Sequence, residues 1–217
     1  MNNCLFSDPC CLPGSRGYPP PMQEGRELDP RVKRTRALLF QALQDLLAEK
    51  GFEAISMQDI AERSTLNRGT IYLHYKDKFA LLEALIEEKF RTLLETRMAG
   101  SSGGCPSALR QLILAVSDFF GNVGGGCTAH RGLFEPLVET AVRGVVRAFL
   151  LKGLECGAKT LSRTDAELRA TAASWAICGT VLEWSRTRPI TAEELADAVQ
   201  PLVAGGLFLD EKHPSMT

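Results

Sequence analysis

The amino-acid sequence predicts an all-α protein, and three observations support this fold class. From Asp29 onward, apolar residues recur at the three- and four-residue spacing of amphipathic helices. No stretch alternates apolar and polar residues as a half-buried strand does. Residues that favour helix starts and glycines that favour helix ends divide the chain into segments of helical length. We therefore expect a bundle of helices without a sheet.

The first helix is predicted to run from Asp29 to Lys50. Asp29 is a favourable N-cap residue, and Pro30 would occupy the first helical position, where its missing N–H is not needed. Gly51 ends the helical pattern. The apolar stripe of this helix consists of Leu39, Leu43, Leu46 and Leu47.

Two short helices and a longer one are predicted next. Ser56 and Asp59 resemble a capping box, which predicts a second helix ending at about Arg63. A third short helix is expected over residues 67–74, and Asp77 would cap a longer fourth helix. Two short helices joined by a three-residue turn are typical of the helix-turn-helix motif.

The rest of the chain also shows helical spacing, interrupted by glycine-rich and polar segments. We expect the fifth helix to end at Gly121–Gly126, with Gly124–Gly126 acting as a linker. Thr191 would cap the last helix, which Pro201 is expected to kink. The expected helices span residues 106–120, 128–134, 136–157, 165–187 and 192–209.

The composition is that of a globular protein, with 45% hydrophobic and 24% charged residues among 217. No apolar run approaches the roughly 18 residues of a membrane span, so we expect no membrane partner. The first residues lack the features of a secretory signal, which favours a cytoplasmic protein. The seven cysteines, an odd number at irregular spacing, are then expected to be reduced.

Positive charge is concentrated in one early segment. The whole chain has a net charge of −1, but residues 31–78 hold nine Lys and Arg against six Asp and Glu. A local excess of this kind is a modest indication of a polyanionic partner. We expect a flexible, proline-rich tail over residues 1–28, a helix-turn-helix domain over 29–78 and a second helical domain over 79–217.

The segment that carries the two short helices also separates into an inner and an outer set of residues. The inner residues are spaced to close a small three-helix core, and they are Ile55, Ile60, Ala61, Leu66, Ile71 and Tyr75. The outer residues are Gln58, Asn67, Arg68, Thr70, Leu73 and His74. The third helix has about the right size for the major groove of DNA. By their helical spacing alone, Tyr72 and Tyr75 could both be core residues.

Here the residues resemble the tetracycline-repressor (TetR) family of bacterial transcriptional regulators. The resemblance covers about residues 31–85, roughly a quarter of the chain. It rests on three motifs. The first two are Gly51-Phe52 and Ser56-Met57-Gln58-Asp59-Ile60-Ala61. The third runs without interruption from Asn67 to Lys78, includes Gly69-Thr70-Ile71-Tyr72-Leu73-His74-Tyr75, and is followed by Phe79-Ala80-Leu81-Leu82. The remainder of the chain matches that family only in size and helical layout.

The resemblance implies a role in DNA binding for ten residues. Those on the recognition helix would meet bases or nearby phosphates, Tyr72 and His74 would hold phosphate oxygens, and Lys78 would point at the DNA backbone. Arg68 is the best candidate for bidentate readout of a guanine. A solvent-exposed helix face is the alternative for the histidine and lysine. The ten residues are Ser56, Gln58, Asn67, Arg68, Gly69, Thr70, Tyr72, Leu73, His74 and Lys78.

The resemblance also implies a second domain that binds a small effector and forms a homodimer through the last two helices. Both of these helices are apolar on two faces, which requires more than one neighbour. An effector, apolar or aromatic, would move the fourth helix and thereby the DNA-binding domain; ordinary core packing is the alternative. The effector-binding candidates are Phe119, Phe120, His130, Phe134, Trp175 and Cys178.

The sequence therefore predicts a ligand-responsive transcriptional regulator, most simply a repressor, that binds a palindromic operator in the bacterial nucleoid. We expect no enzyme, because no glycine motif of a hydrolase, nucleotide-binding or dinucleotide-binding fold occurs. We expect no metal or cofactor, because Cys127 and His130 have no second ligand pair nearby. There are two alternatives. One is a helical interaction protein that binds no DNA, and the other is a redox-sensing regulator that uses its cysteines.

Overall fold

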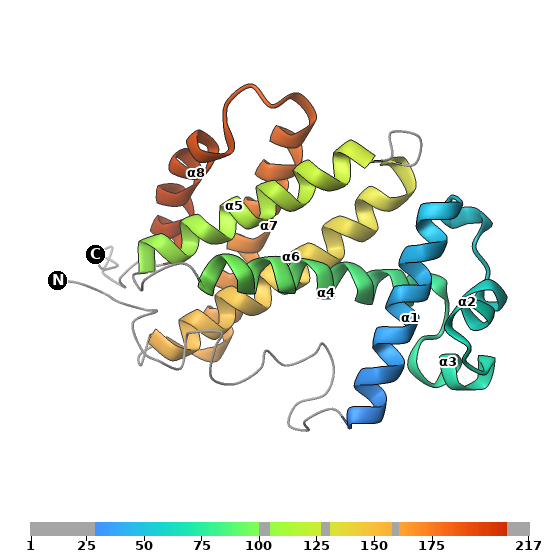
Figure 1. Ribbon diagram of the computed structural model, residues 1–217. Coiled ribbons are helices and arrows are strands. Elements are labelled where there is room, and N and C mark those ends of the chain that lie inside the picture. Colours follow the sequence, from blue (N-terminus) through green and yellow to red (C-terminus); the bar gives the residue numbers. More distant parts are fainter. Residues whose placement is uncertain (1–28, 100–104, 127–130, 158–160, 208–217) are drawn as a thin grey trace, which may run out of the picture. The chain divides into compact units, whose positions relative to one another are not determined.

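The computed structural model describes residues 29–99, 105–126, 131–157 and 161–207, and these form eight α-helices and one short 3₁₀ helix, with no strand among them (Figure 1). The all-α prediction is confirmed. In chain order the elements are α1 (Pro30–Glu49), η2 (Phe52–Ala54), α2 (Met57–Ser64), α3 (Arg68–His74), α4 (Lys78–Ala99), α5 (Cys105–Gly126), α6 (Arg131–Gly157), α7 (Arg163–Thr187) and α8 (Ala192–Leu207).

The chain divides into two compact units, and the division lies inside α4, between Glu88 and Lys89. It falls later than the boundary at residue 78 that the sequence suggested. The physical reason is that the first part of α4 carries buried residues of the first unit, so the core does not end where the helix begins. These residues are Leu81, Leu82, Leu85 and Ile86.

In the first unit, α1 begins where the cap residues predict. The carboxylate of Asp29 accepts a hydrogen bond of 2.9 Å from the backbone N–H of Arg31, and Pro30 occupies the first helical position. One face of α1 is buried and contacts α2. Its buried residues are Leu39, Phe40, Ala42, Leu43 and Leu46.

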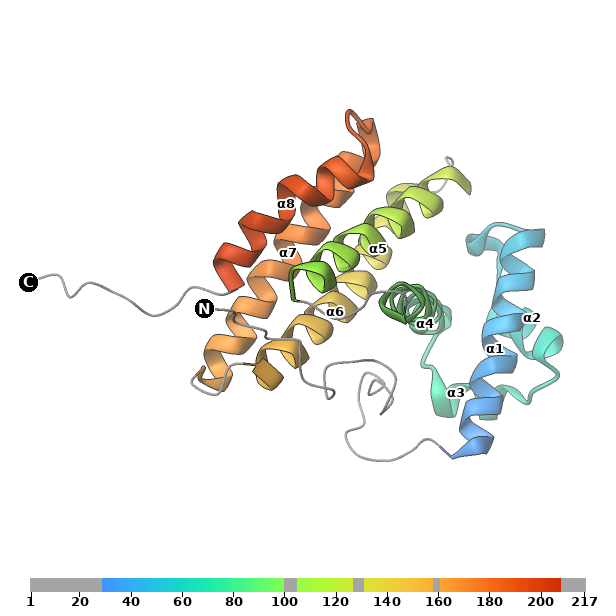
Figure 2. The ribbon, with the colours of Figure 1, turned by 60° about the vertical axis from the view of Figure 1, so that its left-hand side comes forward.

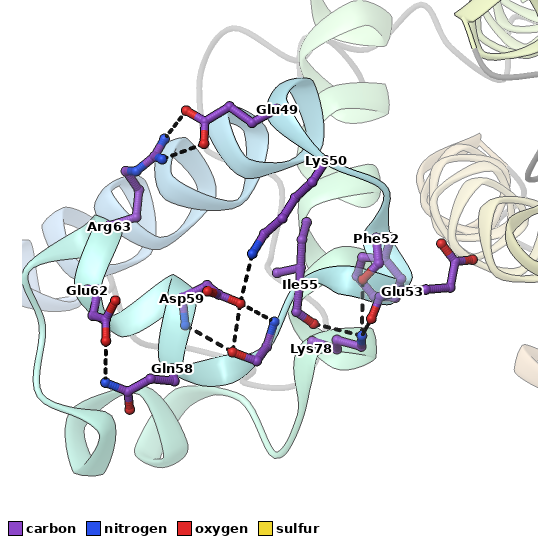
Figure 3. Close-up of polar contacts among 11 residues, drawn as sticks. Glu49, Lys50, Phe52, Glu53, Ile55, Gln58, Asp59, Glu62, Arg63 and Lys78 are labelled. Atoms are coloured by element: carbon purple, nitrogen blue, oxygen red, sulfur yellow. Dashed lines mark hydrogen bonds and ion pairs between the residues drawn. The ribbon is translucent and has the colours of Figure 1, made fainter.

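A complete capping box begins α2, as predicted. The Ser56 hydroxyl accepts from the N–H of Asp59 at 3.1 Å, and the Asp59 carboxylate accepts from the N–H of Ser56 at 2.7 Å. The same carboxylate accepts from the Ser56 hydroxyl and pairs with the ammonium of Lys50 at 3.1 Å (Figure 3). The start of α2 is thereby tied to the end of α1.

The turn between α2 and α3 depends on one residue with a left-handed backbone. Thr65 has φ 58°, and its N–H donates to the carbonyls of Ala61 and Glu62, which closes the end of α2. A β-branched residue rarely adopts this conformation, so tertiary packing must hold it there. Asn67 then caps α3, because its side-chain oxygen accepts from the N–H of Gly69 at 2.8 Å.

The start of α4 is anchored by Lys78. Its ammonium donates hydrogen bonds to the carbonyls of Phe52, Glu53 and Ile55 at 3.0, 3.1 and 2.7 Å (Figure 3). The same nitrogen lies 4.7 Å from the centre of the Phe52 ring, within cation–π range. All three donors of the ammonium are therefore used to connect α4 to the segment between α1 and α2.

In the second unit, α7 packs against α5, α6 and α8, and α5 also contacts α8 (Figures 1 and 2). Its core is mainly aliphatic, as for Leu112, Val142 and Ile177. The last part of α4 joins α5 through the ring of Phe90, whose centre lies 5.4 Å from that of Phe119. Because α4 contributes to both units, it connects them covalently as one helix.

Two predicted helix boundaries in this unit are wrong. The helix α5 does not end at Gly121 but continues to Gly126, so Gly124–Gly126 is not a linker. Glycine weakens a helix without forbidding it. At Gly121 it also has a use, because the guanidinium of Arg188 donates to the Gly121 carbonyl at 2.7 Å, and an added Cβ would lie only 3.0 Å from that group.

The second wrong boundary lies in α6. The predicted helices over 128–134 and 136–157 are one helix from Arg131 onward, with Pro136 inside it; residues 128–130 lie outside the described part. A proline removes one backbone hydrogen bond, but tertiary packing supplies most of the stability of a helix. Burial of Val138, Ala141 and Val142 just after the proline supplies that packing. Pro201 likewise lies inside α8.

Within the described ranges, no helix combines the length and the apolar character that crossing a membrane requires. The same residues contain no cluster of three or more histidine, cysteine, aspartate or glutamate side chains placed to hold a metal ion.

The capping box makes a pH dependence predictable. Hydrogen bonds from the Ser56 hydroxyl and N–H, and then the Lys50 ammonium, lower the pKa of Asp59 from 3.8 to about 2. Because this pKa is lower in the folded state, the stabilisation is complete above the ordinary pKa of 3.8 and is lost as the pH falls towards 2. In Asp59→Asn, we expect the thermal unfolding midpoint to fall less steeply with pH across this window. In Glu62→Gln, which removes an exposed charge from the same helix, the unfolding midpoint should fall with pH as steeply as in the parent protein. An equally steep fall in all three proteins would contradict the role given to Asp59.

The Lys78 anchor predicts a loss of stability in Lys78→Met. The variant keeps the aliphatic part of the side chain but removes all three hydrogen bonds to carbonyls. Since hydrogen bonds to charged groups contribute about 1.5–3 kcal/mol each and are not additive, we expect a loss of about 2–3 kcal/mol. Urea unfolding of the full chain measures it, with hydrogen exchange of residues 30–88 to locate the effect. For Lys76→Met, at an exposed position, the free energy of unfolding should stay within about 0.5 kcal/mol of that of the parent protein. A loss as large as that of Lys78→Met would contradict the anchoring role of Lys78.

Candidate nucleic-acid interface

The candidate interface is the outer face of α3, and a single buried side chain anchors this helix. Ile71 is the buried residue of α3, with 0% of its surface exposed. Beside it, Tyr75 is half-buried, with its ring centre 6.3 Å from that of Phe40 on α1, and burial raises the pKa of its hydroxyl. The predicted inward position of Tyr75 is therefore confirmed in part, since its ring lines the core without being enclosed by it.

The opposite face of α3 is exposed and combines a cation, an aromatic hydroxyl and an aliphatic side chain. Tyr72 is 47% exposed and Leu73 is 85% exposed. The guanidinium carbon of Arg68 lies 5.9 Å from the centre of the Tyr72 ring, and one of its nitrogens donates to the Tyr72 hydroxyl at 3.4 Å. Residues Arg68, Gly69, Tyr72 and Leu73 thus form one surface, which we call the α3 face.

Asn67 and Gly69 form the start of this face. The side-chain oxygen of Asn67 is engaged in capping α3, so that atom holds the helix rather than pointing away from it. A Cβ added at Gly69 would lie 3.3 Å from the same oxygen, which is closer than an ordinary contact. The glycine therefore protects the cap and leaves the backbone of α3 uncovered at this point.

The two predicted residues on α2 are exposed but already engaged. The Ser56 hydroxyl both donates to and accepts from Asp59 within the capping box. The side-chain amide of Gln58 donates to the carboxylate of Glu62 at 2.7 Å. A phosphate near this end of α2 would have to share these groups, while the helix dipole still favours it.

Lys78 is placed differently from the prediction. The sequence assigned its ammonium to the DNA backbone, but the structure directs it to three carbonyls of its own chain. The lysine that is exposed after α3 is Lys76, which the sequence reasoning left without a role. Both residues follow the same motif, so their spacing alone did not distinguish an anchored lysine from an exposed one.

The remaining residues of the interface flank the α3 face. Thr70 and His74 are half-buried, and the His74 ring centre lies 6.5 Å from that of Tyr75. On α1, the side chains of Arg31, Lys33 and Arg34 are exposed, so the unit carries additional positive charge.

The predicted effector-binding residues that the structure describes differ in burial and in their neighbours. Phe119 is half-buried against Phe90, and Phe120 is buried in the core. Trp175 is 52% exposed and lies under the guanidinium of Arg143, whose central carbon is 3.6 Å from the ring centre. Of the other three candidates, His130 lies outside the described residues, and the side chain of Phe134 is not described.

Cys178, the sixth candidate, is fully buried, and burial raises the pKa of its thiol to about 12. A thiol in this state remains protonated at neutral pH and is a poor nucleophile. Cys178 therefore gives no support to the redox-sensing alternative.

A polar recess of about 430 Å³ lies apart from these residues, between α1 and α2. The ion pair of Lys50 with Asp59 and that of Arg63 with Glu49, at 2.6 Å, lie along it (Figure 3). These charged groups are paired with one another, which is typical of a helix–helix contact at a surface. The recess is lined by Leu46, Glu49, Lys50, Asp59, Glu62 and Arg63.

Comparison with known proteins agrees with this geometry. Residues 39–85 match the model of the bacterial regulatory proteins of the tetR family. An uncharacterized HTH-type transcriptional regulator of Bacillus subtilis, YxbF, is 34% identical over 92 residues, which are 42% of this chain and 23% of that protein. The HTH-type transcriptional repressor Rv3405c of Mycobacterium tuberculosis is 34% identical over 67 residues, 31% of this chain and 36% of the relative.

The chain thus spans only about a quarter to a third of the length of the first curated relatives that it matches. Solved structures extend the likeness of fold over most of the chain. The TetR family repressor AlkX of Dietzia sp. superposes with a TM-score of 0.53 at 19% identity, over 84% of this chain and 97% of that protein. A tetR-family regulator of Streptomyces coelicolor gives a TM-score of 0.51 at 21% identity, over 79% and 81%.

The family match covers α2, α3 and the start of α4, which are the elements that build and hold the α3 face. The fold likeness adds the helices of the second unit. Residues 39–85 of this chain are thus similar in sequence to the bacterial regulatory proteins of the tetR family, and most of the chain shares the fold of solved TetR-family structures.

Proposed function

We propose that this protein is a ligand-responsive transcriptional regulator that binds a palindromic operator as a homodimer, most simply a repressor that a small apolar or aromatic effector releases. The observation that carries the proposal is the α3 face, on which Arg68, Tyr72 and Leu73 are presented outward by a helix anchored through Ile71. The helix is narrow enough to enter the major groove of DNA. A regulator of this kind acts on DNA in the bacterial cytoplasm.

Each part of the α3 face fits a different part of duplex DNA. The guanidinium of Arg68 has the donor pattern that matches the two acceptors of guanine. The Tyr72 hydroxyl and the half-buried His74 suit phosphate oxygens at the edges of the groove. The exposed cations of α1 and Lys76 add attraction to phosphates that is independent of sequence.

DNA binding can be tested with the full chain and short duplexes of random sequence, from which bound molecules are selected and sequenced. A regulator of this class should enrich an inverted repeat and bind it less tightly as salt rises, with a log–log slope of about −0.9 for each neutralised phosphate. Arg68→Ala should relax the preference at one position in each half-site, by about 1–3 kcal/mol. Arg163→Ala, a surface arginine of the second unit, should leave the preference unchanged. A helical interaction protein would enrich no sequence at all.

The second unit supports dimer formation through α7 and α8. Each helix buries one face within its own chain and exposes another to which the helix itself contributes no charged side chain over several turns, while the Arg143 guanidinium of α6 lies on the Trp175 ring. On α7 this exposed face consists of Leu168, Ala172, Trp175, Ala176 and Gly179; on α8 it consists of Ala198, Pro201, Leu202, Gly205 and Gly206.

A second copy of the chain is the partner that suits this surface. Large apolar residues such as Leu202, which is 77% exposed, favour burial, and the small residues around it allow close approach of another helix. A pair of such helices from each chain would form a four-helix interface. Two copies of α3 could then read the two halves of a palindrome about one helical turn apart.

Leu202→Glu should convert the dimer into a monomer, because the interface would have to bury an unpaired carboxylate. Size-exclusion chromatography with light scattering measures the mass of the full chain directly. Leu38→Glu, the same substitution at an exposed leucine of the first unit, should remain dimeric. A parent protein that is monomeric, or a Leu202→Glu variant that stays dimeric, would contradict the proposed interface.

An effector of the second unit completes the proposal. A ligand that shifts the DNA-binding state from 99:1 to 1:99 must favour the released state by about 5.5 kcal/mol. The aromatic contact of Phe90 on α4 with Phe119 on α5 supports a route by which packing among these helices acts on α4, the helix shared by both units. This contact is also what an apolar ligand would have to rearrange.

A further inference from the structure

Leu73 is more exposed than any other large apolar side chain in the described part of the first unit. It is 85% exposed, against 47% for Tyr72 and 45% for Phe79. Its neighbour two residues earlier, Ile71, is completely buried, so packing of the domain makes no use of Leu73. The fold would accept a charged or polar residue at this position equally well, and such residues are the usual choice for an exposed helix face.

The position of Leu73 on α3 gives its side chain an unobstructed approach to a partner. Side chains on a helix lean towards its N-terminus, over the residue four positions earlier. For Leu73 that residue is Gly69, which has no side chain. Arg68 lies about 140° away around the helix, at the other edge of the α3 face, so the two side chains contact different base pairs.

We propose that Leu73 determines operator specificity by contacting the C5-methyl group of a thymine in each half-site. This inference rests on the proposed function, because it requires that α3 enters the major groove. Phosphates and the hydrogen-bonding edges of bases give an aliphatic side chain no favourable contact, and covering them would remove their water. The thymine methyl is the apolar group that the base pairs present in that groove.

The test needs operator DNA, so its first step is the selection of random-sequence duplexes by the full chain. Failure to enrich any sequence would overturn the proposed function, and the inference with it. Enrichment of half-sites that contain no thymine would overturn the inference alone. Enrichment of half-sites with thymine allows the second step. In this step, the selected duplex is synthesised with deoxyuridine in place of thymine at one position of the half-site at a time, and the same replacement is made in both half-sites.

Deoxyuridine removes the methyl group and leaves every hydrogen-bonding group of the base in place, so it isolates the proposed contact. Loss of one buried methyl corresponds to roughly a three- to fivefold weaker dissociation constant per half-site, and to about tenfold or more for a symmetric duplex. We expect this loss at one thymine position, and little change at the others. If no position responds in the parent protein, the methyl group is not read and the inference is wrong.

Two variants of the same residue assign the effect to Leu73. Leu73→Ala should bind thymine and deoxyuridine duplexes equally, whereas Leu73→Met, which keeps an apolar side chain of similar size, should retain the preference for thymine. Measurements at low salt keep all variants within a measurable range, because phosphate contacts then contribute more to binding. The substituted residue is exposed, so folding is preserved. A preference for thymine that persists in Leu73→Ala would show that another residue or the shape of the DNA is responsible, and would overturn the proposal.

Discussion

The α3 face of this protein depends on the burial of one side chain in a helix that is too short to be stable alone. The helix α3 has seven residues, whereas isolated helices shorter than about 12–15 residues are marginal in water. It persists because Ile71 is enclosed by the first unit and because the Tyr75 ring lies beside Phe40 on α1. Anchoring one side in this way leaves Arg68, Tyr72 and Leu73 free to contact another molecule.

Polar contacts on both sides of α3 hold its flanking elements in place. Before it, the capping box of Ser56 and Asp59 begins α2 and is tied to α1 through Lys50. After it, Lys78 attaches the start of α4 to the carbonyls of residues 52–55. The residues around the α3 face thus divide into those that build the frame and those that remain available, and Lys78 and the Asn67 side-chain oxygen belong to the frame.

The second unit shows a related division between inward and outward faces. The buried face of α7 includes Ile177 and Cys178, whereas Trp175 is half exposed and carries the guanidinium of Arg143 on its ring. On α8 the inward face includes Leu195 and Val199, whereas Leu202 on the outward face is 77% exposed. In the proposed dimer, one face of each helix would serve the core of its own chain and the other would contact the partner, which would place two copies of α3 to read a palindrome.

The sequence by itself determined the helices of the first unit, since their signals are local: the caps at Asp29, Ser56 and Asn67 and the spacing of apolar residues lie within a few positions of the bonds that they make. It also predicted the outward placement of Arg68 and Leu73, which follows from the period of the helix once Ile71 is buried. Only the tertiary structure decided the partners of Lys78, the left-handed backbone of Thr65 and the continuation of α5 and α6 through glycine and proline. These features depend on residues distant in the sequence, and no local preference of lysine, threonine, glycine or proline reveals which neighbour the fold will bring to them.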